Sequence, residues 1–144
     1  MASPGCNGCP GIGPVERLLI WSARQVALVG LSCPGVDQAF LESLGANGSL
    51  VAVRFKTLLA LMAASASRNI AVGTPCRRCV TRDELNLLVI IESAGCGHFD
   101  LAHRLLVNLV KPGHVDALAH AAEQVAEALA VAGVSVKSRS SVRS

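Results

Sequence analysis

The sequence has few aromatic residues and little charge. Three Phe, one Trp and no Tyr form its aromatic set, and charged residues occupy only 16% of the 144 positions. Nucleic-acid surfaces are typically strongly basic, with aromatic side chains available for base stacking. Here the net charge is only +3, and much of the excess lies in the C-terminal residues. We therefore do not expect the protein to bind nucleic acid.

A long apolar run is also missing. A helix needs about 20 predominantly apolar residues to cross a bilayer, and the longest uncharged run that is mainly apolar, residues 57–67, is about half that length. The N-terminus has neither the basic start nor the apolar stretch of a secretory signal. We expect no membrane contact and a cytoplasmic location, where the six cysteines stay reduced and form no disulfide framework.

Apolar residues make up 51% of the chain, which excludes a disordered protein. The length fits one domain, with residues 1–13 as a flexible Gly/Pro/Cys arm, 14–133 as the helical domain and 134–144 as a flexible Ser/Arg tail. Apolar spacing of three and four residues and helix-type punctuation predict an all-α compact bundle of five to six helices with short loops. The expected helices span residues 14–29, 36–44, 49–66, 81–94, 98–110 and 112–132.

The helix expected over residues 49–66 is the most apolar of the set. One stripe carries Val51, Phe55, Leu58 and Met62, while further apolar residues lie off it, namely Leu50, Val53 and Leu61. This distribution predicts a central helix with more than one buried face.

The densest polar chemistry lies at residues 74–84, directly before a leucine-rich helix. Thr81 and Glu84 have the spacing of a capping box, in which the Thr oxygen and the Glu carboxylate each accept a backbone N–H. We assign Asp83 and Glu84 to this helix start, where negative charge is favourable. No nucleophile motif accompanies them, so we predict no enzymatic activity.

Cys76 and Cys79 precede the capping box and allow three interpretations. Their spacing suits half of a zinc site, which Cys6 and Cys9 would complete from the N-terminal arm. Two neighbouring arginines and a helix N-terminus favour thiolates, so a redox pair is the second interpretation. In the third, the cysteines are small apolar side chains that only pack.

Other metal ligands fit less well. Cys96 and His98 lie at the far end of the helix that follows Cys79, about 20 Å away. A di-iron bundle needs two Glu-x-x-His motifs, whereas the chain offers a single Asp-x-x-His. Asp116 and His120 have the spacing of a surface pair on one helix.

The middle of the chain resembles an uncharacterised family of small all-helical bacterial proteins of unknown function. The resemblance covers roughly residues 15–132. It depends on an arginine-bearing helix, the Ile-Ala-Val run at 70–72, and the cysteine turn that leads into Val80-Thr81-Arg82-Asp83-Glu84. It implies a helical fold and carries no activity or site residue to this chain.

These observations predict a non-catalytic helical interaction module that binds a protein partner or forms a homo-oligomer. A homodimer is one form of this hypothesis, because 51% apolar residues can exceed what one small core hides. We expect no cofactor in this case. The alternative is a zinc-binding or thiol-redox-responsive protein that uses Cys76 and Cys79.

Overall fold

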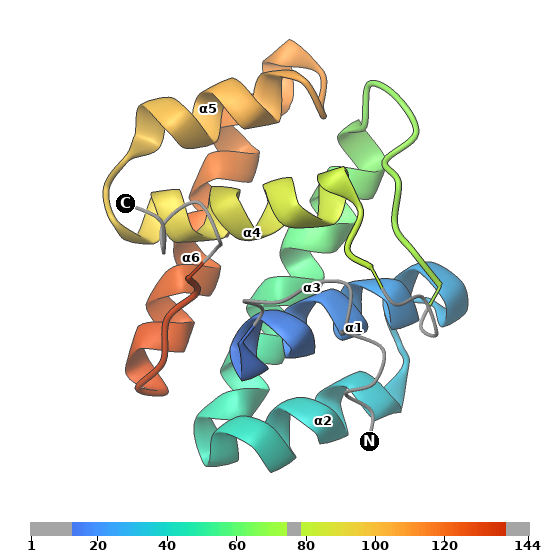
Figure 1. Cartoon of the computed structure of the whole chain (residues 1–144), viewed down its shortest axis with the longest axis vertical. Coiled ribbons are helices and arrows are strands. Elements are labelled where there is room, and N and C mark those ends of the chain that lie inside the picture. Colours follow the sequence, from blue (N-terminus) through green and yellow to red (C-terminus); the bar gives the residue numbers. More distant parts are fainter. Residues whose placement is uncertain (1–12, 75–78, 138–144) are drawn as a thin grey trace.

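A computed structural model describes residues 13–74 and 79–137 (Figure 1). Within these residues the only β-type pairing is an isolated bridge between Ala66 and Val110. The described elements are helices joined by short connections, as predicted: α1 (Pro14–Val29), α2 (Pro34–Leu44), η2 (Gly45–Asn47), α3 (Gly48–Ser65), α4 (Arg82–Gly95), α5 (Phe99–Val107), η3 (Pro112–His114) and α6 (Val115–Val131).

Helices α3 and α6 form the most extensive helix pair. Helix α4 packs across α6, and α5 covers the other side of α4, while α2 packs on α3 and α1 contacts α2, α3 and α4. Figure 1 shows this order, with α5 at one end of the molecule, α2 at the other, and α4 between α5 and α1.

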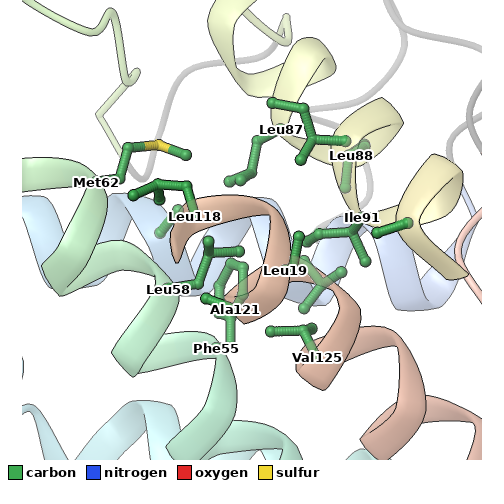
Figure 2. Close-up of a cluster of buried hydrophobic side chains, with 14 of the residues drawn as sticks. Leu19, Phe55, Leu58, Met62, Leu87, Leu88, Ile91, Leu118, Ala121 and Val125 are labelled. Carbon is green, nitrogen blue, oxygen red and sulfur yellow. The ribbon is translucent and has the colours of Figure 1, made fainter. Parts of the chain in front are cut away.

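The core forms where α1, α3, α4 and α6 meet. Figure 2 shows side chains from all four helices converging in one cluster. Its members are aliphatic apart from one Phe and one Met, as the scarcity of aromatics predicted. The labelled buried residues are Leu19, Phe55, Leu58, Met62, Leu87, Leu88, Ile91, Leu118, Ala121 and Val125.

Helix α1 has the bounds that the sequence predicted, with Pro14 in its first turn and Gly30 after its end. Its buried face includes two charged residues. Val29 is 60% exposed, whereas Glu16 and Arg24 are buried. Two charged side chains therefore point into the protein beside apolar ones such as Leu19.

Helix α5 is shorter than predicted because the chain after Asn108 bonds to the segment that follows α3. The Ser67 N–H donates to the Leu109 carbonyl at 3.0 Å, and the Lys111 N–H donates to the Ser65 carbonyl at 2.9 Å. These bonds also displace the start of α6 to Val115, after a short 3-10 turn.

Helix α3 starts at Gly48, where its backbone crosses that of α2. A Cβ atom at this position would lie 2.2 Å from the Phe40 carbonyl oxygen and 2.6 Å from the carbonyl carbon. Only glycine lets the two backbones approach this closely. Because η2 leads directly into α3, the helix begins one residue before the predicted start at 49, and no side chain caps it.

The predicted second buried face of α3 is also wrong. Val51, Phe55, Leu58 and Met62 are buried as expected, but the residues off this stripe remain in contact with solvent. Their exposed fractions are 40% for Leu50, 59% for Val53 and 37% for Leu61. Helix α3 therefore has one buried face and an apolar outer face.

The helical stretch 34–65, which includes α2 and α3, is long and apolar enough to cross a membrane by length and composition alone. In the fold, 39% of its most apolar 18-residue window is buried. The core helix of a soluble protein passes the same test. The expected cytoplasmic location and the expected lack of membrane contact therefore stay predictions.

The chain after α6 returns to the start of α1. Val136 is buried, and the Lys137 N–H donates to the Glu16 carboxylate at 2.6 Å. This contact accounts for the burial of Glu16. The proposed boundaries at residues 13 and 133 stay predictions, since residues 1–12 and 138–144 lie outside the described part of the chain.

Candidate functional site

The start of α4 has the capping box that the sequence predicted. The Glu84 N–H donates to Thr81 Oγ1 at 3.0 Å, and the Thr81 N–H donates to Glu84 Oε1 at 2.8 Å. The Thr81 hydroxyl also donates to the Ala71 carbonyl at 2.6 Å. Thr81 therefore fixes both the start of α4 and the segment that precedes it.

Replacing Thr81 with alanine should lower the free energy of unfolding by about 1–2 kcal/mol, because it removes an N-cap and a bond to Ala71. Thr57→Ala is the matched control, since the Thr57 hydroxyl is exposed and bonds only to the Val53 carbonyl within α3. That change should be neutral or slightly stabilising. Urea unfolding of both variants measures the difference, and a Thr81→Ala midpoint equal to the parent's would contradict the cap.

Glu84 forms a buried ion pair with Arg24 of α1. Arg24 Nε donates to Glu84 Oε2 and Arg24 Nη2 to Glu84 Oε1, both at 2.7 Å, and the side chains are 7% and 1% exposed. Burial alone would raise the pKa of the Glu84 carboxyl. The bonds from Arg24 and from the Thr81 and Gly73 N–H groups outweigh burial and lower this pKa.

Asp83 forms a second bidentate ion pair, with Arg68. Arg68 Nη1 donates to Asp83 Oδ2 at 2.9 Å, and Nη2 donates to Oδ1 at 2.8 Å. These bonds are the main reason that the pKa of Asp83 lies below its ordinary value and that of Arg68 above it. The carboxylate is 6% exposed, whereas the arginine side chain is 45% exposed.

Residues 66–74, which we call the strap, are held by the two carboxylates. The Ala71 N–H donates to Asp83 Oδ2 at 2.7 Å, and the Gly73 N–H donates to Glu84 Oε2 at 2.9 Å. Arg68 belongs to the strap and also donates to the Asn108 carbonyl at 3.3 Å. The strap is therefore fixed to the start of α4 mainly by charge-assisted bonds.

Acidification should weaken this arrangement. Because the folded pKa values of Asp83 and Glu84 are lowered, the unfolded chain binds more protons as pH falls past its ordinary carboxyl pKa values of about 3.9 and 4.3. The two carboxylates should therefore contribute their whole stabilisation above about pH 5. The free energy of unfolding should decrease as the pH falls below this value and through the two carboxyl pKa values. Asp83→Asn should be less stable at neutral pH and show a shallower fall, which urea titrations at several pH values measure. An unchanged fall would contradict a role for Asp83.

An open groove of about 590 Å³ lies between α1 and α3, with the strap and the start of α4 along its edge. We call it the α1/α3 groove. Most of its lining is aliphatic, and Arg68, Asp83 and Glu84 are its charged members. The lining residues are Ala23, Val26, Ala27, Gly30, Leu31, Leu59, Ala60, Met62, Ala63, Ala66, Arg68, Asn69, Ile70, Val72, Asp83, Glu84 and Leu87.

The groove offers binding surface and little chemistry. Its two carboxylates are both held in ion pairs by arginines. Among the described residues that line it, none is Ser, Cys, His or Lys.

The cysteine hypothesis falls largely outside the described residues. Cys6 and Cys9 belong to residues 1–12, and Cys76 belongs to residues 75–78. Both segments lie outside the described part of the chain. Cys79 is exposed, and its carbonyl accepts a bond from Arg24 Nη2 at 3.1 Å. The residues that the structure describes include no group of three or more Cys, His, Asp or Glu that could hold a metal ion. The zinc and thiol-redox interpretations therefore stay predictions, and the metal content of the purified protein would test the first.

The expected pair between Asp116 and His120 is wrong. Asp116 Oδ1 lies 3.3 Å from Nε2 of His103 on α5. The contact therefore joins α5 to α6 and does not link two residues of α6. His120 instead lines a shallower groove between α3 and α6.

Sequence reasoning missed Arg24 and Arg68, the two arginines that hold the site together. Arg24 is 60 positions from Glu84 and Arg68 is 15 positions from Asp83. One signal was available: adjacent acidic residues on a helix that is otherwise buried need cationic partners. The sequence does not show which arginines supply them.

A scan against protein-family models, a search of curated proteins and a search of solved structures each find no match to the chain. This result is consistent with the resemblance drawn from the sequence, which is to a helical family without an assigned activity.

Proposed function

We propose that the chain is a non-catalytic protein-binding module, and that the α1/α3 groove receives the apolar face of a helix from a partner protein. The observation that carries this proposal is the groove itself. It is open, about 590 Å³ in volume and walled by aliphatic side chains. Apolar pockets of this size with few polar groups are the usual binding sites of proteins.

A helix fits the groove better than an extended peptide does. Strand addition needs an exposed sheet edge, and the described residues contain only the bridge between Ala66 and Val110. The walls of the groove are two helices that present small residues, including Ala23 and Ala27 on α1 and Ala60 and Ala63 on α3. Small residues at the contact let a third helix approach closely.

The charge at the strap favours one orientation of the bound helix. At the strap, the exposed member of the second ion pair is Arg68, and its partner Asp83 is buried. A bound helix would therefore meet mostly uncharged walls and a guanidinium at the strap. The C-terminal end of a helix carries partial negative charge and unpaired carbonyl groups, so we expect it to lie near Arg68.

Site-specific photo-crosslinking tests the proposal. A photoreactive amino acid replaces Ala63, which is exposed and lines the groove, in cells that make the protein. Ala46 in η2 is the matched control, because it is an exposed alanine outside the groove. We expect the Ala63 variant to capture a second protein through a segment with apolar residues three and four positions apart.

The capture should disappear when Ala60 is also replaced by glutamate, and it should survive the change Ala46→Glu. Equal yields of crosslinked product from the Ala63 and Ala46 variants would contradict the proposal. So would a captured segment that is extended or strongly charged. A product that contains only a second copy of this chain would also contradict it, because the groove would then serve self-association.

A further inference from the structure

A second surface lies on the other flank of α3, where its outer face meets α6. Leu50, Val53 and Leu61 remain exposed there, and the sequence carries no charge from residue 57 to residue 67. A groove of about 360 Å³ runs between the two helices and is lined by Arg54, Thr57, Leu61, Ala117, His120, Ala121 and Gln124. We call this surface the α3/α6 face.

Helices α3 and α6 run antiparallel along this face. At one end, Asn47 Nδ2 before α3 donates to the carbonyl of Val131 at the end of α6, at 3.5 Å. At the other end, Leu61 of α3 and Ala117 of α6 line the same groove. Each residue of α3 therefore has an α6 residue beside it, in the reverse order along the chain.

The α3/α6 face carries opposite charges that do not pair within the chain. Arg54 lines the groove on the α3 side, and Glu127 is exposed on α6, one turn after Gln124. Among the described residues, neither side chain makes an ion pair. A partner that covers this face would gain most if it offered a carboxylate to Arg54 and a cation to Glu127.

We propose that a second copy of this chain covers the α3/α6 face, about a two-fold axis that lies in the face and runs parallel to the two helices. Such an axis places α3 of one copy on α6 of the other at the same height. Each α3 residue then meets the α6 residue that lies beside it in its own copy. Arg54 faces Gln124 of the second copy with Glu127 one turn away, and Leu61 faces Ala117.

This arrangement satisfies the requirements of a closed dimer. The contact is self-complementary, as two-fold symmetry demands. The two α3 and two α6 helices become antiparallel neighbours, the usual packing of a four-helix bundle. Helices of 17–18 residues are about 27 Å long and a pair is roughly 20 Å wide, which provides enough area for the roughly 1,000 Å² in total that a specific interface needs.

The dimer does not depend on the binding function proposed above. The α1/α3 groove lies on the opposite flank of α3 and shares no lining residue with the α3/α6 groove. A failure of the dimer would therefore leave the crosslinking experiment at Ala63 unaffected, and the reverse also holds.

Sedimentation of the full chain over a range of concentrations tests the dimer. Leu61 and Leu101 are both leucines in helices and both 37% exposed, but only Leu61 lies on the α3/α6 face. We expect the parent and Leu101→Glu to form dimers of equal strength. Leu61→Glu should raise the dimer dissociation constant at least about tenfold, because it would place an unpaired carboxylate against apolar side chains of the second copy, while circular dichroism shows an unchanged fold.

A charge exchange tests the register directly. Arg54→Glu and Glu127→Arg should each weaken the dimer, and the double variant should recover most of the affinity, because each altered residue then meets its altered partner in the other copy. A parent that sediments as a monomer at its highest soluble concentration would overturn the proposal. Equal effects of Leu61→Glu and Leu101→Glu would also overturn it, as would a double variant no stronger than the weaker single variant.

Discussion

Replacing Arg24 with alanine should lower the free energy of unfolding by about 3–5 kcal/mol, the usual cost of removing one partner from a buried ion pair. The Glu84 side chain is 1% exposed, so water cannot replace the lost guanidinium. Two backbone N–H groups, from Gly73 and Thr81, would still bond to the carboxylate. They do not neutralise its charge, and the residues directly before α4 would lose the bond from Arg24 to the Cys79 carbonyl.

The matched control is an ion pair of similar length at the surface. Lys56 Nζ lies 2.9 Å from Asp37 Oδ2, and the two side chains are 16% and 49% exposed. Asp37→Ala should cost less than about 1 kcal/mol, because the flexible lysine can extend its ammonium into water once the carboxylate is removed. Guanidinium unfolding gives both values. Equal costs for Arg24→Ala and Asp37→Ala would contradict a buried, desolvated pair.

A double variant separates the charge from the packing. Arg24→Met with Glu84→Gln removes both buried charges and keeps side chains of similar length. It should be more stable than Arg24→Ala alone, since no unpaired charge remains. Full recovery is not expected, because the glutamine has one oxygen for bonds that Glu84 makes with two.

Replacing Gly48 with alanine should be the second severe change, with a loss of about 3 kcal/mol or more. The added Cβ would lie 2.2 Å from the Phe40 carbonyl oxygen, so the backbones of α2 and α3 must separate. Overpacking of this kind usually costs about 1–3 kcal/mol, and here the obstacle is backbone, which cannot rotate away. Phe40 is also fully buried, so any separation disturbs the core.

Gly113→Ala is the control for this change. A Cβ at Gly113 would meet nothing within 4 Å, and the alanine would reduce the entropy of the unfolded chain. Its effect should therefore be neutral or a gain of up to about 1 kcal/mol. Thermal unfolding measures both variants, and a Gly48→Ala protein as stable as the parent would show that α2 and α3 do not cross closely.

The parts of the fold that depend on local signals could be predicted from the sequence. Pro14 and Gly30 defined the bounds of α1, because proline suits the first turn of a helix and glycine its end. The capping box at Thr81 needs only residues three positions apart, so its spacing was visible in the chain. Local signals also misplaced one boundary, because the bonds that end α5 early come from residues more than 40 positions upstream.

The candidate site could not be predicted because its contacts are distant in sequence. Residue type alone does not distinguish a buried arginine from an exposed one. Arg24 lies in a stretch with apolar residues on either side. The α3 helix shows the opposite error. Periodicity does not distinguish a helix buried on two faces from one that exposes apolar residues on its outer face. Helix α3 is of the second type, with Val53 59% exposed.

The ion pairs also explain why the α1/α3 groove is preformed. The strap forms one edge of the groove, and its N–H groups at Ala71 and Gly73 are fixed by carboxylates that are themselves held by arginines. A preformed groove spares a binding partner the entropy cost of ordering this segment. Loss of Arg24 should therefore weaken binding as well as folding.

Methyl NMR of methionine-labelled protein is the most direct test that the groove is open and apolar in solution. Of the two methionines in the chain, Met62 lines the groove. The probe is anilinonaphthalene sulfonate, which binds exposed apolar surface and whose rings shift nearby methyl signals. We expect saturable movement of the Met62 signal, and loss of this movement in Ala63→Glu but not in Ala46→Glu. A Met62 signal that stays fixed, or that moves equally in both variants, would contradict an open groove between α1 and α3.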